Sequence, residues 1–305
     1  YKVYFDYVLP LALRQSKPDL FFSPDGFLSL KTKVKQVGVI HDINFEHRPE
    51  DLPKTYSKYY RSRFPRFAKI SDQIITVSEY SKKDIAETYG INSEKIHVAY
   101  NGANDMFKPL DAFKKEEIRR RYSKGIPYFV FVGNFSFRKN IHGIIKAYNL
   151  YRKRGKLKLL LVGNPLWTYA EMQQELDNSP YKEDILFPGH LKQTDLVKIV
   201  ASAEAMIFPS FFEGFGIPIV ESFKAGTPVI TSNKTSLPEV AGDAAMIAEP
   251  DDHEKISNFL FEIESNDNQR LNLINKGLIR AEFFHWNNTA NKVKNVLFDC
   301  LNNAK

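Results

Sequence analysis

Residues 208–221 read FPSFFEGFGIPIVE, and this stretch predicts a strand end, a glycine turn and a helix in succession. Gly214 and Gly216 allow the turn to approach a ligand closely, and the helix N-terminus that follows attracts phosphate through its N–H groups. Glu213 and Glu221 flank that N-terminus, where their carboxylates could accept hydrogen bonds from sugar hydroxyls. The helix dipole alone also favours acids at this end, so the pattern by itself leaves a structural and a functional interpretation open.

Outward from this stretch, β-rich runs alternate with helix-length amphipathic segments, which is typical of parallel sheets joined by helices. The predicted strands are 20–22, 36–40, 73–77, 96–99, 128–132, 158–162, 185–187, 205–208, 228–231 and 245–248. Ligands of open parallel sheets bind beyond the carboxyl ends of the strands. The first candidates for chemistry are therefore the residues at those ends: His41, Ser78, Asn101, Gly133, Gly163 and Ser210.

The length of 305 residues, with 43% hydrophobic residues, is sufficient for two domains. A loop rich in turn residues and a charged helix precede a new strand, so we expect a first domain over 1–125 and a second over 126–283. A last helix over 284–305 could return to the first domain. The first domain opens without the strand and glycine-rich turn of a dinucleotide-type half, so we expect its beginning to be missing.

The formal net charge of +7 lies wholly in residues 1–125. Much of it falls in 54–69, where basic and aromatic residues interleave in a predicted helix. Such a helix could attach to an anionic membrane surface, or it could be half buried with its cations reaching solvent. No apolar run is long enough to span a membrane, no secretory signal is visible, and the single Cys300 cannot form an internal disulfide. We therefore expect a cytoplasmic protein, with possible peripheral attachment to the inner membrane face.

Several further segments agree in order and spacing with one known family. The stretch around Glu213 resembles the donor-site motif Glu-x7-Glu of the retaining glycosyltransferases of family 4, also called group 1. Other landmarks of that family are matched by 39–42 (VIHD), 76–82 (TVSEYSK), 100–102 (YNG), 132–140 (VGNFSFRKN) and 236–242 (SLPEVAG). The resemblance implies an α/β GT-B fold: two Rossmann-like, doubly wound parallel-sheet domains with an interdomain cleft.

The resemblance also implies roles for individual residues. Glu213 would contact hydroxyls of the transferred sugar, and Glu221 would hold the nucleotide ribose. Donor contacts would come from backbone groups of Gly214, Phe215 and Gly216. Arg138 and Lys139 would neutralise the departing diphosphate, as a fork and a point charge can. The family often has a further arginine where this chain has Asn134, which leaves this task to two cations.

Three further segments carry expectations. His41 matches the histidine that contacts the donor sugar, although a histidine at a strand end is as often structural. The segment 187–191 (FPGHL) resembles the family's nucleobase contact and adds Leu191, with His190, to the donor site. Residues 236–239 also have the pattern of a capping box at a helix start.

The sequence thus predicts a hexosyltransferase that acts on a nucleotide diphosphate sugar and a saccharide or lipid-linked acceptor. The landmarks look most like bacterial mannosyl- or rhamnosyl-type enzymes of surface polysaccharide and lipopolysaccharide synthesis. GDP-mannose is therefore the first expected donor, with a UDP-sugar as the alternative. No cofactor is expected, and no metal, because zinc-ligand patterns and the Asp-x-Asp triplet of metal-dependent transferases are absent from the sequence.

Two other classes of function remain as alternatives. A glycoside hydrolase could use Glu213 and Glu221 as its carboxylate pair, but it would not need cations beside a phosphate-binding helix. A basic membrane- or nucleic-acid-binding module would fit the sequence pI of about 9.1. No nucleic-acid-binding motif is present, so we expect no nucleic-acid partner.

Overall fold

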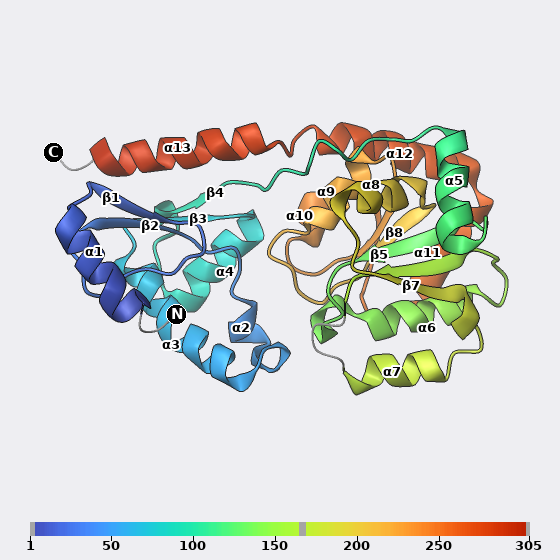
Figure 1. The fold of residues 1–305 in the computed structure, drawn as a ribbon, viewed down its shortest axis with the longest axis horizontal. Coiled ribbons are helices and arrows are strands. Elements are labelled where there is room, and N and C mark those ends of the chain that lie inside the picture. The colour runs from blue at the N-terminus through green and yellow to red at the C-terminus, as the bar shows by residue number, and fades with distance from the viewer. Residues whose placement is uncertain (1–3, 165–168, 303–305) are drawn as a thin grey trace. The chain divides into compact units, whose positions relative to one another are not determined.

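The computed structural model describes residues 4–164 and 169–302. The chain divides into two units, Tyr1–Asn101 with Trp286–Lys305 and Gly102–His285. Each unit contains one all-parallel sheet flanked by helices (Figure 1). The sequence predicts a boundary at residue 125, but the structure divides the chain after residue 101.

Helix α5 (Ala112–Ser123) explains this difference, because it packs on the other elements of the second unit and so belongs to that unit. Its Arg119 guanidinium donates to the carbonyl oxygen of Ser202 at 3.0 and 2.9 Å and to a Glu204 carboxylate oxygen at 2.7 Å. Helix α5 also lies along α8 (Gln193–Ser202). The chain therefore enters the second unit before this helix begins.

The second unit has a six-stranded sheet in the order β7-β6-β5-β8-β9-β10. Its strands are β5 (Tyr128–Val132), β6 (Lys158–Val162), β7 (Ile185–Gly189), β8 (Ala205–Phe208), β9 (Val229–Ser232) and β10 (Ala245–Ala248). The chain adds strands in one direction from β5 to β7, then returns to the other side of β5 at β8. This reversal is the switch point of a doubly wound sheet, where ligands of such folds bind.

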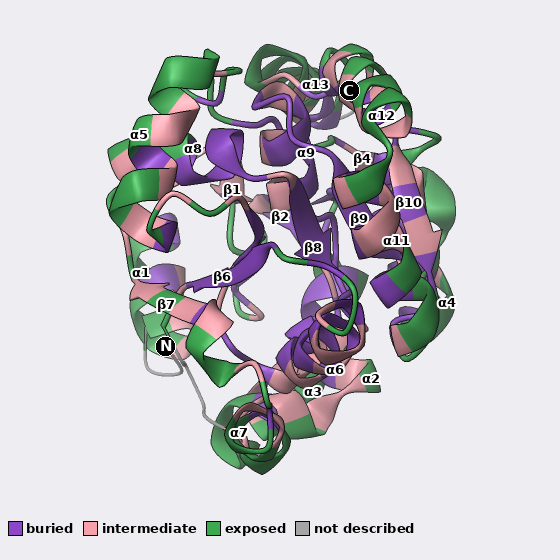
Figure 2. Cartoon of the chain, turned by 90° about the vertical axis from the view of Figure 1, so that its right-hand side faces the viewer, coloured by how far each residue is buried: buried purple, intermediate pink, exposed green. Residues whose placement is uncertain are grey.

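The helices of the second unit cover both faces of this sheet. They are α5, α6 (Ile141–Tyr151), α7 (Ala170–Asp177), α8, α9 (Ile217–Lys224), α10 (Leu237–Ala241), α11 (His253–Ser265) and α12 (Asp267–Ala281), with short 3-10 helices at Phe137–Lys139 and Lys182–Asp184. Strands β6 and β8 are buried along their whole length (Figure 2). Continuous apolar strands of this kind are expected where helices shield both faces.

The first unit has four described strands in chain order: β1 (Leu20–Ser23), β2 (Lys35–Val39), β3 (Gln73–Thr76) and β4 (Ile96–Val98). A π-helix (Tyr4–Val8) and α1 (Leu9–Ser16) precede them. The other helical elements of this unit are α2 (Asn44–His47), a 3-10 turn (Pro49–Asp51), α3 (Lys54–Ile70), α4 (Glu79–Tyr89), a second 3-10 turn (Ser93–Lys95) and α13 (Trp286–Asn302).

Neighbouring residues of the strands in the first unit point to opposite faces of its sheet. Ile74 packs in the cluster beneath α2, α3 and α4, whereas Ile75 packs with Val296 and Cys300 of α13 on the other face. The last helix of the chain therefore belongs to the core of the first unit. Cys300 is buried there as an ordinary helix residue.

Helix α3 turns its aromatic side chains toward the sheet. Phe64 and Phe67 are buried, and Tyr59 and Tyr60 pack against the same cluster. These four rings are thus part of the core, whereas Tyr56 of the same helix is 50% exposed. The exposed side of the helix carries cations: Lys54, Lys58, Arg61, Arg66 and Lys69. Within the described residues, no helix is both long and apolar enough to cross a membrane.

Candidate functional site

The loops that follow β5 and β8 carry the predicted site. Strands β5 and β8 pair directly, so their carboxyl ends lie together at the switch point of the second unit. After β5 the chain makes the 3-10 turn that holds Arg138 and Lys139, and after β8 it runs through Glu213 to α9. The backbone N–H of Phe211 donates to the Arg138 carbonyl oxygen at 2.8 Å and joins the two loops.

Two cations meet one carboxylate at this point. The Lys139 ammonium donates to Glu213 Oε1 at 2.5 Å, and Arg138 Nη1 lies 3.0 Å from Glu213 Oε2. Arg138 Nη1 also donates to the carbonyl oxygen of Phe212 at 3.0 Å. The side chains of Lys139 and Glu213 are both 9% exposed. The cluster therefore carries one net positive charge in a place with little water.

The cations decide the protonation of Glu213. Burial by itself would raise the pKa of this carboxyl, but the charges of Lys139 and Arg138 outweigh it and hold the pKa below its usual value. Glu213 is therefore a carboxylate at neutral pH. It can accept hydrogen bonds from hydroxyl groups but cannot serve as a proton donor there.

The backbone around Glu213 is held from the loop between β9 and α10. The Glu213 N–H donates to Thr235 Oγ1 at 3.1 Å, and Ser236 Oγ lies 2.9 Å from the Glu213 carbonyl oxygen and 3.1 Å from that of Phe215. The capping-box prediction for 236–239 was wrong, because the Ser236 hydroxyl points to these carbonyls and makes no cap hydrogen bond to α10. Thr235, with a φ of 53°, was not foreseen, and no local signal marks it.

The predicted donor-binding backbone precedes and begins helix α9. Gly216 is its N-cap with a φ of 102°, a left-handed conformation that glycine adopts without strain. The Phe215 ring is buried edge-on against Phe284, with ring centroids 5.5 Å apart. Gly214 lies between Glu213 and this anchored ring. The positive end of the helix dipole thus lies at the end of the loop that carries Glu213.

Glu221 lies in α9, beyond its first turn, and differs from Glu213 in its surroundings. Burial raises the pKa of its carboxyl to about 7, with no cation to offset it. A half-buried carboxyl of this kind gains from a ligand hydroxyl that hydrogen bonds to it.

The other predicted residues are each described by the contacts within their own unit. Leu191 follows β7, the edge strand of the sheet, and is half buried beside the exposed His190. His41 belongs to the first unit, where it follows β2, and its Nε2 lies 3.1 Å from the Pro24 carbonyl oxygen. Asn134, at the position where the family often has arginine, accepts a hydrogen bond from Ser136 Oγ at 3.0 Å.

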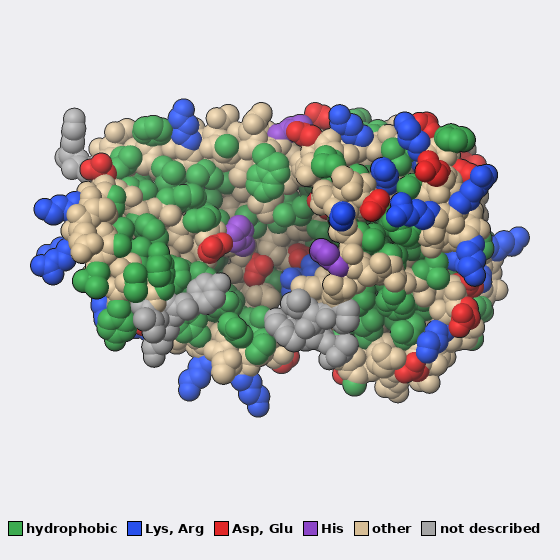
Figure 3. Space-filling view, viewed as in Figure 1, with side chains coloured by type: hydrophobic (Ala, Val, Ile, Leu, Met, Phe, Trp, Pro, Cys, Tyr) green, Lys and Arg blue, Asp and Glu red, His purple; other side chains and the backbone are tan. Residues whose placement is uncertain are grey.

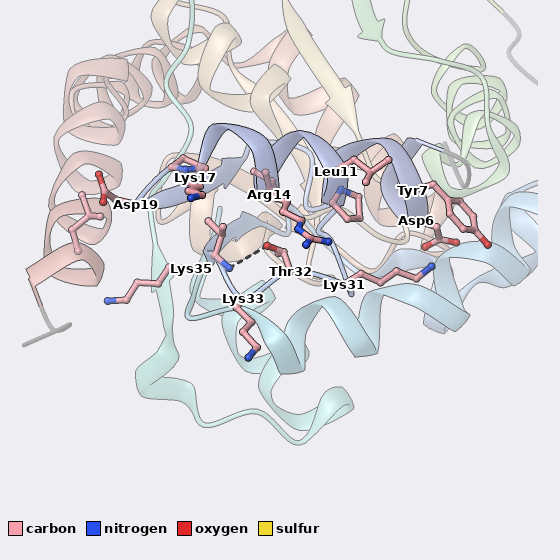
Figure 4. Close-up of a pocket in the computed structure, with 15 residues that line it drawn as sticks. Asp6, Tyr7, Leu11, Arg14, Lys17, Asp19, Lys31, Thr32, Lys33 and Lys35 are labelled. Atoms are coloured by element: carbon pink, nitrogen blue, oxygen red, sulfur yellow. Dashed lines mark hydrogen bonds between the residues drawn. The ribbon is translucent and has the colours of Figure 1, made fainter.

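A separate cavity of about 1160 Å³ in the first unit lies between α1 and residues 31–35 (Figure 4). Its lining includes five basic residues that sequence reasoning did not single out: Arg14, Lys17, Lys31, Lys33 and Lys35. On the face seen in Figure 3, acidic side chains are interspersed among the basic ones of the second unit. Basic residues of the first unit thus gather both around this cavity and on the exposed side of α3.

The described residues contain no group of three or more His, Cys, Asp or Glu side chains that could hold a metal ion. The charged groups at the switch point are instead the two cations and the carboxylate.

Comparison with known proteins identifies the family of this chain. A family model described as "Glycosyl transferases group 1" matches residues 114–279, and one described as "Glycosyltransferase Family 4" matches residues 1–106. The O-antigen chain mannosyltransferase B of Escherichia coli is 29% identical over 288 residues, 93% of this chain and 75% of that protein. The O-antigen chain mannosyltransferase RfbU of Salmonella typhimurium is 30% identical over 231 residues, 75% of this chain and 61% of that protein.

This chain therefore spans less than two thirds of the length of the second relative. Among solved structures, Anabaena HepE in complex with UDP and glucose matches with a TM-score of 0.79 at 19% identity, over 95% of this chain and 80% of that one. The likeness shows the fold, two parallel-sheet α/β units as in the GT-B glycosyltransferases. Since the first family model covers more than half of the sequence, including the whole cluster at the switch point, the chain belongs to the group 1 glycosyltransferases.

Proposed function

We propose that this glycosyltransferase is a retaining mannosyltransferase that uses GDP-mannose in the synthesis of a surface polysaccharide such as O-antigen. The observation that carries the proposal is the cluster of Arg138, Lys139 and Glu213 at the switch point beside α9. Similarity to two O-antigen mannosyltransferases supports the choice of sugar and pathway. The acceptor would be a saccharide or a lipid-linked saccharide.

The charges of the cluster suit a reaction with an anionic leaving group. When the bond between the sugar and the diphosphate breaks, negative charge develops on the phosphate oxygen. Arg138, Lys139 and the N-terminus of α9 would stabilise that charge where it develops, with little reorganisation. We propose that these groups do the work of a divalent ion and that the nucleotide sugar is a substrate, with no cofactor.

The carboxylates would position the donor. Glu213, held ionised by its two cations, would accept hydrogen bonds from hydroxyls of the transferred sugar. Glu221 would accept hydrogen bonds from the ribose hydroxyls. The acceptor hydroxyl would attack on the face that the diphosphate leaves, and a phosphate oxygen would take its proton, so that the anomeric configuration is kept. The protein then contributes orientation and electrostatic stabilisation.

Contact with a membrane is a further part of the proposal. The exposed side of α3 carries five cations, which would attract anionic headgroups on the inner face of a membrane, where a lipid-linked acceptor would lie. Because Tyr59, Tyr60, Phe64 and Phe67 of α3 pack in the core and Tyr56 alone of its aromatic rings is exposed, this attachment would be mainly electrostatic and reversible. The protein would then act as a cytoplasmic, peripheral membrane enzyme.

The two carboxyls also keep glycoside hydrolysis as a second candidate. Glu213 has a lowered pKa and Glu221 a raised one, and opposite shifts are typical of a nucleophile and an acid. A glycoside, however, has no diphosphate for Arg138 and Lys139 to bind. Release of free sugar from a glycoside that carries no nucleotide would favour hydrolysis over transfer.

A nucleotide screen tests the leading proposal. Isothermal calorimetry or thermal-shift measurements with GDP, UDP, ADP and their sugars should show the strongest binding for GDP and GDP-mannose. Binding of UDP compounds alone would overturn the donor assignment in favour of a UDP-sugar-dependent transferase. NMR of the product made from GDP-mannose should show the anomeric configuration of the donor, and an inverted product would overturn the retaining mechanism.

A further inference from the structure

Asn140 lies directly after Lys139 and forms the N-cap of α6. It is fully buried and has a φ of 59°, in the left-handed region that asparagine tolerates better than most residues. Its Oδ1 accepts a hydrogen bond from the Gly143 N–H at 3.1 Å. This contact alone would describe an ordinary helix cap.

The amide nitrogen of Asn140 makes two further bonds that a helix cap does not require. Nδ2 donates to the carbonyl oxygens of Pro209 at 3.2 Å and Pro250 at 2.8 Å. Both hydrogens of the amide and its oxygen are therefore used. An aspartate in this place would still accept the hydrogen bond from the Gly143 N–H, but it has no N–H groups to donate. The carbonyl oxygens of Pro209 and Pro250 would then lose these hydrogen bonds.

These bonds connect the loops that build the site. Lys139 precedes Asn140 in the loop after β5, Pro209 lies four residues before Glu213 in the loop after β8, and Pro250 follows β10. One buried side chain thus joins three loops at the carboxyl edge of the sheet. The distance between the Lys139 ammonium and the Glu213 carboxylate depends on how these loops are held.

We propose that Asn140 is a positioning residue for the donor diphosphate. Through its two donated hydrogen bonds it holds the loop of Lys139 against the loop of Glu213. This fixes the Lys139 ammonium in the position from which it can bind the diphosphate. It acts through Lys139 and need not touch the donor. The inference rests on the proposed nucleotide-sugar transfer, because its readout is diphosphate recognition.

The test uses Asn140→Asp and Asn140→Gly in the full chain. Asn140→Asp keeps a good helix cap, and Asn140→Gly keeps a residue that accepts the positive φ. The matched control is Asn266→Asp, because Asn266 caps α12 through the Gln269 N–H at 3.1 Å and lies outside the cluster. A second perturbation is Gly143→Ala, since a Cβ there would lie 2.2 Å from Asn140 Oδ1 and displace the amide.

The readout is the ratio of the dissociation constants of GMP and GDP, measured by calorimetry on folded protein, together with kcat and KM for GDP-mannose. Loss of global stability lowers the melting temperature but does not change this ratio. We expect the ratio and kcat each to fall about tenfold or more in both Asn140 variants and in Gly143→Ala, since small displacements of positioning groups have effects of this size. The control should keep the wild-type values.

A double variant shows whether Asn140 acts through Lys139. If it does, Lys139→Met with Asn140→Gly should have the same ratio as Lys139→Met alone. Additive losses, or full retention of the ratio in Asn140→Asp, would overturn the inference and leave Asn140 as a helix cap. Absence of nucleoside diphosphate binding by the wild-type protein would instead overturn the proposed function.

Discussion

The Lys139 ammonium lies 2.5 Å from Glu213 Oε1, although 74 residues of chain separate the two side chains. The sheet brings them together, because β5 and β8 are neighbours and each residue lies in the loop that follows its strand. The pair is buried, so its charges interact strongly, and Arg138 adds a second cation. Several consequences of this arrangement can be measured.

Replacement of Glu213 by glutamine removes the only carboxylate of the cluster and leaves two cations beside a neutral amide. We expect the free energy of unfolding to fall by about 3 kcal/mol, as when one partner of a buried ion pair is lost. Transfer activity should fall about 100-fold or more. Urea unfolding and initial rates measure the two effects. Glu183→Gln, at an exposed carboxylate in the 3-10 helix before β7, should change neither, and an active Glu213→Gln enzyme would contradict the role of Glu213.

Glu221 predicts a dependence of stability on pH. Its carboxyl has a pKa of about 7 in the folded protein against 4.5 ordinarily, so the folded state binds this proton more tightly than the unfolded chain. This contribution to stability is full below pH 4.5 and is lost as the pH rises through 7. After a discount for partial exposure, we expect a loss of roughly 2 kcal/mol.

Urea unfolding between pH 4 and 8 measures this change, relative to Glu221→Gln, which should lack it. The sign for binding is opposite, because ribose hydroxyls donate best to the ionised carboxylate. Nucleotide affinity of the wild-type protein should therefore rise through pH 7, and that of Glu221→Gln should not. Parallel pH profiles of the two proteins would count against a ribose contact.

Two glycines at strand ends of the second unit should respond very differently to alanine. A Cβ on Gly163 would lie 1.8 Å from the Gly133 carbonyl oxygen, whereas a Cβ on Gly189 would have nothing within 4 Å. Both have a positive φ, so both substitutions strain the backbone by about 1 to 2 kcal/mol. Only Gly163→Ala must also displace a strand end. Thermal unfolding should show a much larger loss for Gly163→Ala, and equal losses would contradict the packing described for these loops.

Ser236→Ala distinguishes the observed role of this hydroxyl from the expected helix cap. Loss of its hydrogen bonding to the Glu213 and Phe215 carbonyl oxygens should cost about 1 to 2 kcal/mol of stability and loosen the donor loop. We therefore expect weaker nucleoside diphosphate binding by calorimetry. The control is Ser265→Ala, which removes an exposed hydroxyl that donates to the Phe261 carbonyl oxygen of its own helix. It should leave the affinity for the nucleoside diphosphate unchanged. Unchanged affinity in Ser236→Ala would argue that the loop is held by other contacts.

Membrane attachment can be assigned to one of two basic surfaces. If α3 carries it, Lys58→Glu with Arg66→Glu should reduce co-sedimentation with vesicles of phosphatidylglycerol and phosphatidylcholine about thirtyfold or more, at roughly 1 kcal/mol for each cation. Lys31→Glu with Lys33→Glu, in the cavity beside α1, serves as the charge-matched control. Binding should weaken as salt is raised. Loss of vesicle binding only in the control variant would assign the membrane contact to the basic surface beside α1 and not to α3.

Much of the fold was predictable from local pattern. The ranges 128–132, 158–162, 205–208 and 245–248 were predicted as strands and are strands with the same bounds. Apolar runs bounded by turn residues carry this information. The central strands β5, β6 and β8 are buried on both faces, and the edge strand β10 alternates buried and half-buried residues. The prediction for 185–187 was too short, since β7 continues through the proline to Gly189 at the edge of the sheet, where a proline is tolerated.

The amino-acid sequence by itself determined the strand and helix alternation, the motif around Glu213 and the family. These depend on residue types at short spacing. Only the tertiary structure decided that Lys139 and Arg138 pair with Glu213, that Ser236 holds a loop, that the aromatic side of α3 belongs to the core, and that Asn140 joins three loops. The physical reason is that such contacts depend on which strands become neighbours in the sheet, and the pairing of β5 with β8 is set by the packing of the whole unit.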